Sequence, residues 1–212
     1  MNVLVLSAHP DDETLGCGGT IKRLADEGAN IHLITFTDGE GARGINKNRN
    51  IVLGKVCKML GIRSFISGNF PDNKRDSVPL LDLCKFIEKN KGKEPDIIFT
   101  HHRNCLNVDH SMVYKATITA FRPQFGKKHI IYSYYVPSST DYNPFNDFKG
   151  NIFFNIKDQL STKLECLKIY DDEMRKYPHT RSYKNIENLA YVNGSKVGLL
   201  CAESFELVRS VI

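Results

Sequence analysis

Short apolar runs alternate with amphipathic segments along most of this chain. The runs are apolar on both faces and predict buried strands at residues 2–7, 31–37, 63–66, 96–100 and 130–136. The segments between them carry apolar residues at helical spacing and predict helices at residues 20–27, 48–60, 80–91 and 111–121. Strands that alternate with helices in this way favour an α/β fold with a mostly parallel sheet covered by helices on both faces.

The latter part of the chain continues this pattern less regularly. It predicts a strand at residues 152–155, a long helix from about residue 158 to 176 and a further helix at 182–192. No internal repeat, low-complexity segment or linker divides the sequence. We therefore expect one domain over residues 1–212, which is long enough to bury a sizeable core.

Composition narrows the functional classes. Hydrophobic residues make up 41% and charged residues 25% of the chain, as in ordinary globular proteins, and no apolar run is as long as a membrane span. The net charge of +5 suits an anionic substrate, but Lys and Arg form no basic block, so nucleic-acid binding is not expected. The six cysteines include no C-x-x-C pair and predict reduced thiols. Without a leader-like segment, we expect a cytoplasmic protein, and a homo-oligomer is left open.

A histidine and three acids crowd the end of the first predicted strand. They are His9, Asp11, Asp12 and Glu13, directly after an apolar run. Burying so much unpaired charge is costly, so such a cluster has a cation partner or lies in solvent. An imidazole and a carboxylate three positions apart can bind one metal ion, which leaves Asp11 free to transfer protons. The pattern is typical of metal hydrolases.

A second polar cluster follows another predicted strand. Residues 101–110 contain three histidines and an aspartate and come directly after the strand at 96–100. Function in open α/β sheets lies beyond the carboxyl ends of the strands, so both clusters are expected at one sheet edge. Two histidines and one carboxylate with an open position form a common catalytic zinc site. Together the clusters predict a metal site, with His110 held by the start of a helix.

The two clusters resemble the motifs of a known family. The sequence His-Pro-Asp-Asp-Glu at 9–13 and Asn-Val-Asp-His at 107–110 are similar to those of the zinc-dependent de-N-acetylases related to N-acetylglucosaminyl-phosphatidylinositol deacetylase, the LmbE-like family. Segments 37–43, 70–77 and 178–182 resemble further parts of its members. The resemblance covers nearly the whole chain and implies a Rossmann-like fold.

The resemblance also implies roles for individual residues. His9, Asp12 and His110 correspond to the zinc ligands, with another divalent transition metal as the alternative. Asp11 corresponds to the general base. Arg43, at the end of a predicted strand, and Arg181, in the segment 178–182, are candidate substrate contacts.

One position departs from the family pattern. Several members have a histidine three positions before the last zinc ligand, where this chain has Asn107. An asparagine can donate a hydrogen bond to an oxyanion but cannot supply a proton. The general acid therefore stays open among His179, His101 and His102, with Asp11 returning its own proton as the alternative. We favour His179, because a turn after the long predicted helix could aim it across the site.

Two acids in the clusters also have structural interpretations. Glu13 is expected to be structural or to support a ligand rather than bind the metal. Asp109 is either a helix cap or the orienting partner of a catalytic group. Asp72, in the segment 70–77, is expected to be a turn residue.

These residues lead to one favoured function and two alternatives. The favoured function is zinc-dependent hydrolysis of the N-acetyl group of an N-acetylated amino sugar or its conjugate, which releases acetate and a free amine. One alternative is a Rossmann-like module that binds a sugar or nucleotide without efficient catalysis. The other is an amidase of a larger thiol-sugar conjugate. A binding module has no need of both a ligand set and a spare base, which favours the enzyme.

Overall fold

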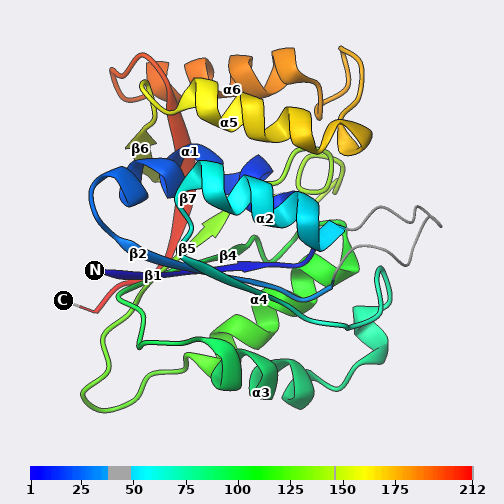
Figure 1. Ribbon diagram of the computed structural model, residues 1–212, viewed down its shortest axis with the longest axis vertical. Coiled ribbons are helices and arrows are strands. Elements are labelled where there is room, and N and C mark those ends of the chain that lie inside the picture. The colour runs from blue at the N-terminus through cyan, green and yellow to red at the C-terminus, as the bar shows by residue number, and fades with distance from the viewer. Residues whose placement is uncertain (38–48, 146, 212) are drawn as a thin grey trace.

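One sheet forms the centre of the molecule (Figure 1). The computed structural model describes residues 1–37, 49–145 and 147–211. In these residues seven strands pair in the order β3-β2-β1-β4-β5-β7-β6. The parallel strands are β1 (Asn2–Ser7), β2 (Asn30–Thr35), β3 (Ser64–Ser67), β4 (Ile97–His101) and β5 (Ile130–Tyr134). The antiparallel strands at one edge are β6 (Ile152–Asn155) and β7 (Ala202–Arg209).

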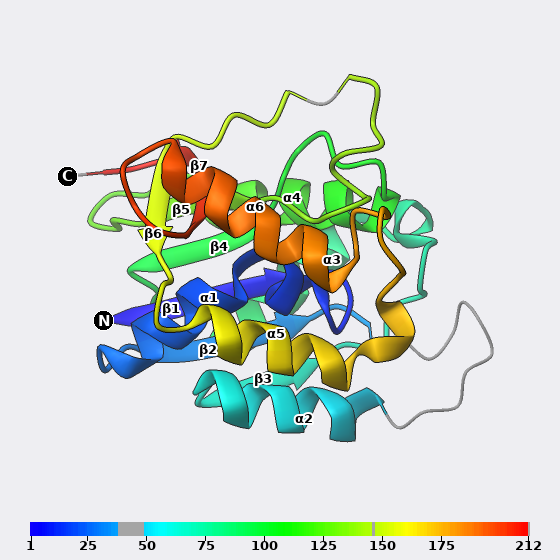
Figure 2. The same ribbon diagram turned by 90° about the horizontal axis from the view of Figure 1, so that it is seen from above.

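Helices cover both faces of this sheet (Figures 1 and 2). One face carries α1 (Asp12–Asp26), α2 (Arg49–Leu60), α5 (Leu160–Ile169) and α6 (Tyr183–Ser195). The other carries α3 (Leu80–Asn90) and α4 (Val108–Ala120). The predicted α/β class, with a mostly parallel sheet between two helical layers, is confirmed. Within the described residues, no helix is long and apolar enough to cross a membrane.

Two predicted boundaries are wrong, each for a physical reason. α1 begins at Asp12 rather than at residue 20, because the glycines that weaken its helical pattern serve close packing. A Cβ on Gly16 would lie 2.3 Å from the ring of Tyr134. The predicted helix at 158–176 ends at Ile169, where Tyr170 turns the chain into the short 3-10 helix η2 (Asp171–Glu173).

Strand β7 was not predicted at all. It contains Glu203 and Glu206 among its apolar residues, and both acids are buried. Buried acids break the apolar pattern by which a central strand is recognised. Each of them pairs with a cationic side chain from another part of the chain. These partners, which make their burial possible, come together only in the folded protein.

Glu203 stabilises an irregular helix. At Cys17 the backbone of α1 leaves the helical range, with φ −144° and ψ 20°, which frees the N–H groups of the next turn. The carboxylate of Glu203 accepts hydrogen bonds from the N–H of Gly19 (3.0 Å) and of Thr20 (2.6 Å). It also pairs with the ammonium of Lys163 at 2.6 Å, and both side chains are buried. One acid therefore joins α1, α5 and β7.

We expect Glu203→Ala to destabilise the fold strongly. The change leaves the ammonium of Lys163 buried without its carboxylate, which typically costs about 3–5 kcal/mol of unfolding free energy. The matched control is Glu165→Ala, which removes the exposed pair with Lys168 on the same helix and should cost less than about 1 kcal/mol. Denaturant unfolding measures both. Equal, small losses would contradict the structural role of Glu203.

Candidate metal centre and active site

Both polar clusters lie at the carboxyl ends of neighbouring strands. Residues 9–13 follow β1 and residues 102–110 follow β4, and these two strands pair in parallel. The chain connects β1 to β2 on one side, whereas β4 lies on the other side, so the strand order changes direction here. Crevices at such a point are where open α/β sheets bind ligands.

Three side chains converge so that they could hold one metal ion. His9, Asp12 and His110 each offer one ligand atom, and these atoms all lie within 4.8 Å of one another. One oxygen of Asp12 is 3.2 Å from Nδ1 of His9 and 3.2 Å from Nε2 of His110. The other oxygen of Asp12 and Nε2 of His110 are buried without a hydrogen bond. Buried polar atoms without a hydrogen bond are rare, and a carboxylate oxygen and a ring nitrogen of this kind fit a bound cation.

The electrostatics of Asp12 and His110 also favour a positive charge beside Asp12. Burial acts to raise the pKa of Asp12, but the nearby His110 and His101 outweigh it and hold that pKa well below its usual range. Burial acts to lower the pKa of His110, yet the carboxylate of Asp12 raises it to about 9. The buried charge of Asp12 thus draws either a proton or a metal ion to its neighbours.

Further side chains orient the histidines. Nε2 of His9 lies 3.0 Å from Asp109, whose carboxylate also accepts hydrogen bonds from the backbone and guanidinium of Arg75. Nδ1 of His110 lies 3.1 Å from the sulfur of Cys105. A carboxylate on the far nitrogen of a ligand histidine fixes the orientation of its ring. Asp109 therefore acts as an orienting partner within the first turn of α4, rather than as its cap.

A second group of ligand-capable atoms shares His9. It consists of His9, Asp72 and Asp109, and Nε2 of His9 is 3.1 Å from Asp72. The guanidinium of Arg75 lies 2.9 Å from Asp109 and already neutralises it. This group therefore has less need of a cation than the set around Asp12.

Asp11 lies beside the ligand set on a strained backbone. Its φ of 136° is rare for a residue other than glycine, and its side chain is almost fully buried. Its backbone N–H donates to Glu13, which also accepts from the hydroxyl of Tyr170. Burial and the charge of Asp12 raise the pKa of Asp11 to about 8, whereas Arg181 lowers it. A cation bound by Asp12 would lower it further.

Arg181 contacts this acid directly. Its Nη1 lies 3.1 Å from the carboxylate of Asp11, and its Nε donates to the carbonyl of Pro137 and the hydroxyl of Ser138. The side chain of Arg181 also lines a cavity at this site. Its contact with substrate stays a prediction. Arg43, the other predicted substrate contact, lies outside the described residues.

Asn107 has a second task besides the predicted one. It caps α4, because its side-chain oxygen accepts from the N–H of Asp109 at 2.8 Å. Its amide nitrogen donates to the side chain of Asn73 at 3.1 Å. Asn107 lines the cavity, and because its amide nitrogen carries two hydrogens, the contact with Asn73 leaves one for a hydrogen bond to an oxyanion.

Only one of the three candidate acids lines the cavity. His101 is fully buried, where its Nε2 accepts from the N–H of Ala8, and His102 is buried against Glu206. His179 lines the same cavity as His9 and Asp11. Its Nδ1 accepts from the N–H of Arg181, so a neutral ring carries its proton on Nε2.

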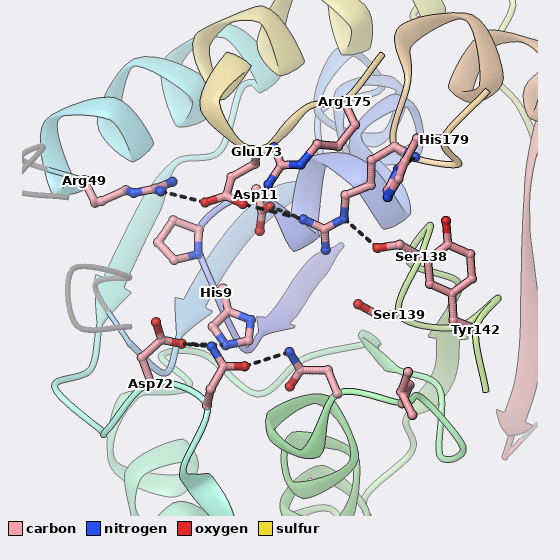
Figure 3. A pocket seen from close by; sticks show the side chains of 15 residues that line it. His9, Asp11, Arg49, Asp72, Ser138, Ser139, Tyr142, Glu173, Arg175 and His179 are labelled. Carbon is pink, nitrogen blue, oxygen red and sulfur yellow. Dashed lines mark hydrogen bonds and ion pairs between the residues drawn. The ribbon is translucent and has the colours of Figure 1, made fainter. Parts of the chain in front are cut away.

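A cavity of about 450 Å³ connects these groups (Figure 3). Its size falls in the range of small-molecule sites. Its lining joins the two loops to segments from the second half of the chain, and consists of His9, Pro10, Asp11, Arg49, Asp72, Asn73, Leu106, Asn107, Ser138, Ser139, Tyr142, Glu173, Arg175, His179 and Arg181. Asp72 is thus part of the cavity wall and more than a turn residue.

Comparison with known proteins agrees with this geometry. The family model described as PIG-L: GlcNAc-PI de-N-acetylase matches residues 4–121, which is more than half of the chain. The chain belongs to this family. It is also 31% identical to the uncharacterized deacetylase YaiS of Escherichia coli over 175 residues, which are 78% of this chain and 88% of that protein.

A second relative matches over a shorter stretch. The 1D-myo-inositol 2-acetamido-2-deoxy-alpha-D-glucopyranoside deacetylase of Rhodococcus opacus is 44% identical over 62 residues, which are 29% of this chain and 21% of that enzyme. The match therefore leaves most of that enzyme's length uncompared.

Solved structures share the fold. The protein TT1542 of Thermus thermophilus superimposes with a TM-score of 0.76 at 22% identity, over 99% of this chain and 96% of that one. The N,N'-diacetylchitobiose deacetylase of Pyrococcus horikoshii gives 0.75 at 21% identity, over 98% and 83%. The hydratase GalB gives 0.74 at 16% identity, over 100% and 97%. Since one of these proteins is a hydratase, the fold alone does not determine the reaction.

Several cavity residues of this family member were not predicted. Arg49, Glu173, Arg175 and Tyr142 all line the cavity. The role of the segment around Glu173 was missed because the predicted helix at 158–176 included it. The run of three acids at 171–173, unusual for the middle of an amphipathic helix, is the signal that could have revealed the turn.

Proposed function

We propose that this protein is a metal-dependent N-deacetylase that hydrolyses the N-acetyl group of an amino sugar or its conjugate, and that its metal is zinc. The observation that carries the proposal is a spare carboxylate, Asp11, which lines the cavity together with His9, whose ligand atom converges with those of Asp12 and His110. Membership of the de-N-acetylase family supports it. The names of the relatives, which include deacetylases of sugar conjugates, support the substrate class.

The residues divide the chemistry between them. A zinc ion held by His9, Asp12 and His110 would polarise the amide carbonyl and acidify water. Asp11 accepts the proton of the attacking water, and His179 protonates the leaving nitrogen, with return of the proton by Asp11 as the alternative. The hydrogen bond and ion pair from Arg181 hold the carboxylate of Asp11 toward the cavity. Asn107 offers its amide to the oxyanion.

Measuring acetate release tests the proposal. The protein, purified without added zinc, is assayed for metal content and then incubated with N-acetylglucosamine derivatives. We expect bound zinc, acetate and free amine in equal amounts, loss of turnover after chelation and recovery with zinc. Cleavage of only larger thiol-sugar amides would favour the amidase alternative. Ligand binding without acetate release would favour the binding module.

His179 is the predicted general acid, and its substitution has a defined outcome. We expect His179→Ala to lower kcat about 10²-fold and to remove or shift the alkaline limb of its pH profile, because Nε2 can donate a proton to the leaving nitrogen. The matched control is His32→Ala, which removes a histidine that does not line the cavity. An unchanged limb and rate would leave Asp11 as the sole proton shuttle.

A further inference from the structure

The charged groups of the cavity wall are mostly paired with one another. Asp11 pairs with Arg181, and Glu173 pairs with Arg49 at 2.7 Å. Asp72 lies 3.1 Å from His9. These contacts bring opposite charges together, so they leave little net charge for a substrate to meet.

Arg175 differs from the other arginines of the wall. Its Nη1 donates to the backbone carbonyls of Asp172 (2.8 Å) and Met174 (2.7 Å). Within the described residues, it is the one arginine of the cavity lining with no carboxylate partner. Its backbone N–H donates to the carbonyl of Arg181, which ties it to the segment that holds Asp11. A fixed positive charge therefore faces the cavity.

The way this guanidinium is held selects a type of ligand. Both hydrogens of Nη1 are used by the two carbonyls, which orients the plane of the group. The edge formed by Nε and Nη2 then keeps a fixed orientation. Its two N–H donors match the two oxygens of a carboxylate or phosphate. Because the other charges of the cavity wall pair with one another, the positive charge of Arg175 is left to attract an anion.

The position of Arg175 shows which part of a substrate it can reach. In Figure 3, Arg175, Glu173 and His179 extend from one wall, and His9 and Asp72 from the facing wall. Asp11 lies between these walls, next to Glu173, so an acetamido group that reacts between His9 and Asp11 leaves Arg175 to contact the rest of the substrate. We propose that Arg175 binds a carboxylate or phosphate on the substituent of the amino sugar, away from the acetamido group. This proposal rests on the proposed function.

Two glycosides of the same shape and different charge test it. They are the carboxymethyl and carbamoylmethyl glycosides of N-acetylglucosamine, of one anomer. We expect kcat/KM of the wild type to be about tenfold higher for the carboxymethyl compound, mostly through KM, and this preference to shrink as salt is added. N-Acetylglucosamine 1-phosphate, compared with the methyl glycoside, distinguishes a phosphate preference from a carboxylate preference.

Variants then assign the preference to one side chain. Arg175→Gln should reduce the ratio between the two glycosides to about one, and Arg175→Lys should keep part of it, because a lysine retains the charge but not the two-pronged geometry. The matched control is Lys176→Gln, which removes the same charge at the next residue, outside the cavity lining, and should keep the wild-type ratio.

The outcomes separate the two proposals. If the wild type turns over both glycosides equally and Arg175→Gln changes nothing, the role of Arg175 is wrong and the deacetylase function stands. If no acetate is released from any compound, the proposed function fails. Dissociation constants of the two glycosides, measured by calorimetry on wild type and Arg175→Gln, still decide the role of Arg175 in that case. If the carboxymethyl glycoside bound wild type and Arg175→Gln with equal affinity, the role of Arg175 would be overturned.

Discussion

Replacing Asp11 by asparagine should remove most of the turnover and leave the metal and the fold in place. Asparagine has the shape of aspartate but cannot accept the proton of the attacking water, so we expect kcat to fall by about 10²–10⁴-fold. Zinc content should stay near that of the wild type, since Asp11 is not among the converging ligand atoms. Acetate release, metal analysis and thermal unfolding measure the three properties.

The matched control is Asp76→Asn. Asp76 is an exposed aspartate in the 3-10 helix η1 (Arg75–Ser77) and does not line the cavity, so its loss should leave kcat unchanged. Near wild-type turnover in Asp11→Asn would mean that another group is the base. Loss of zinc together with turnover would instead place Asp11 in the ligand set.

The sheet and the location of the site could be predicted because both depend on local sequence. Strands apolar on both faces identify a parallel sheet, and the polar residues that follow β1 and β4 identify the edge where ligands bind. The convergence of His9, Asp12 and His110 follows from that topology, since neighbouring parallel strands end side by side. Their role as metal ligands stays a prediction.

Apolar periodicity did not predict the opposite wall, because the turn that forms it depends on tertiary packing. The apolar spacing that suggested a helix to residue 176 is real, since Tyr170 and Met174 are both buried. The hydroxyl of Tyr170 donates to Glu13, and the chain turns there toward the site. Periodicity reports which residues are buried, but it does not report where a helix ends once a buried polar contact competes with it.

Arg181 shows the same limit at a single residue. Its sequence context indicated a role in the site and suggested a contact with substrate. Within the protein it contacts Asp11, Pro137 and Ser138, which the sequence did not indicate, and the contact with substrate stays a prediction. A sequence can place an arginine near a carboxylate only when the intervening fold is known, because residues 11 and 181 are joined by most of the chain.

Removal of a metal ligand should have the other large effect. We expect His110→Ala to lower zinc affinity more than about 100-fold and to abolish turnover. Loss of a group that only orients a ligand typically costs about 10–100-fold. Asp109→Asn should be milder for zinc, with about 10–100-fold weaker binding, because Asp109 contacts the converging atoms only through His9. It also removes the carboxylate partner of the buried Arg75, so the free energy of unfolding is measured on the same variant. Competition with a chelating dye measures both affinities, and circular dichroism checks the fold.

The order of these two effects is what tests the ligand set. His110 offers an atom to the converging group, whereas Asp109 reaches it only through Nε2 of His9. If the metal were instead held by His9, Asp72 and Asp109, Asp109→Asn would be the more damaging change and His110→Ala the milder one. His32→Ala, a histidine outside both groups, should bind zinc as the wild type does. The ranking of the affinities therefore decides between the two groups of ligand atoms that share His9.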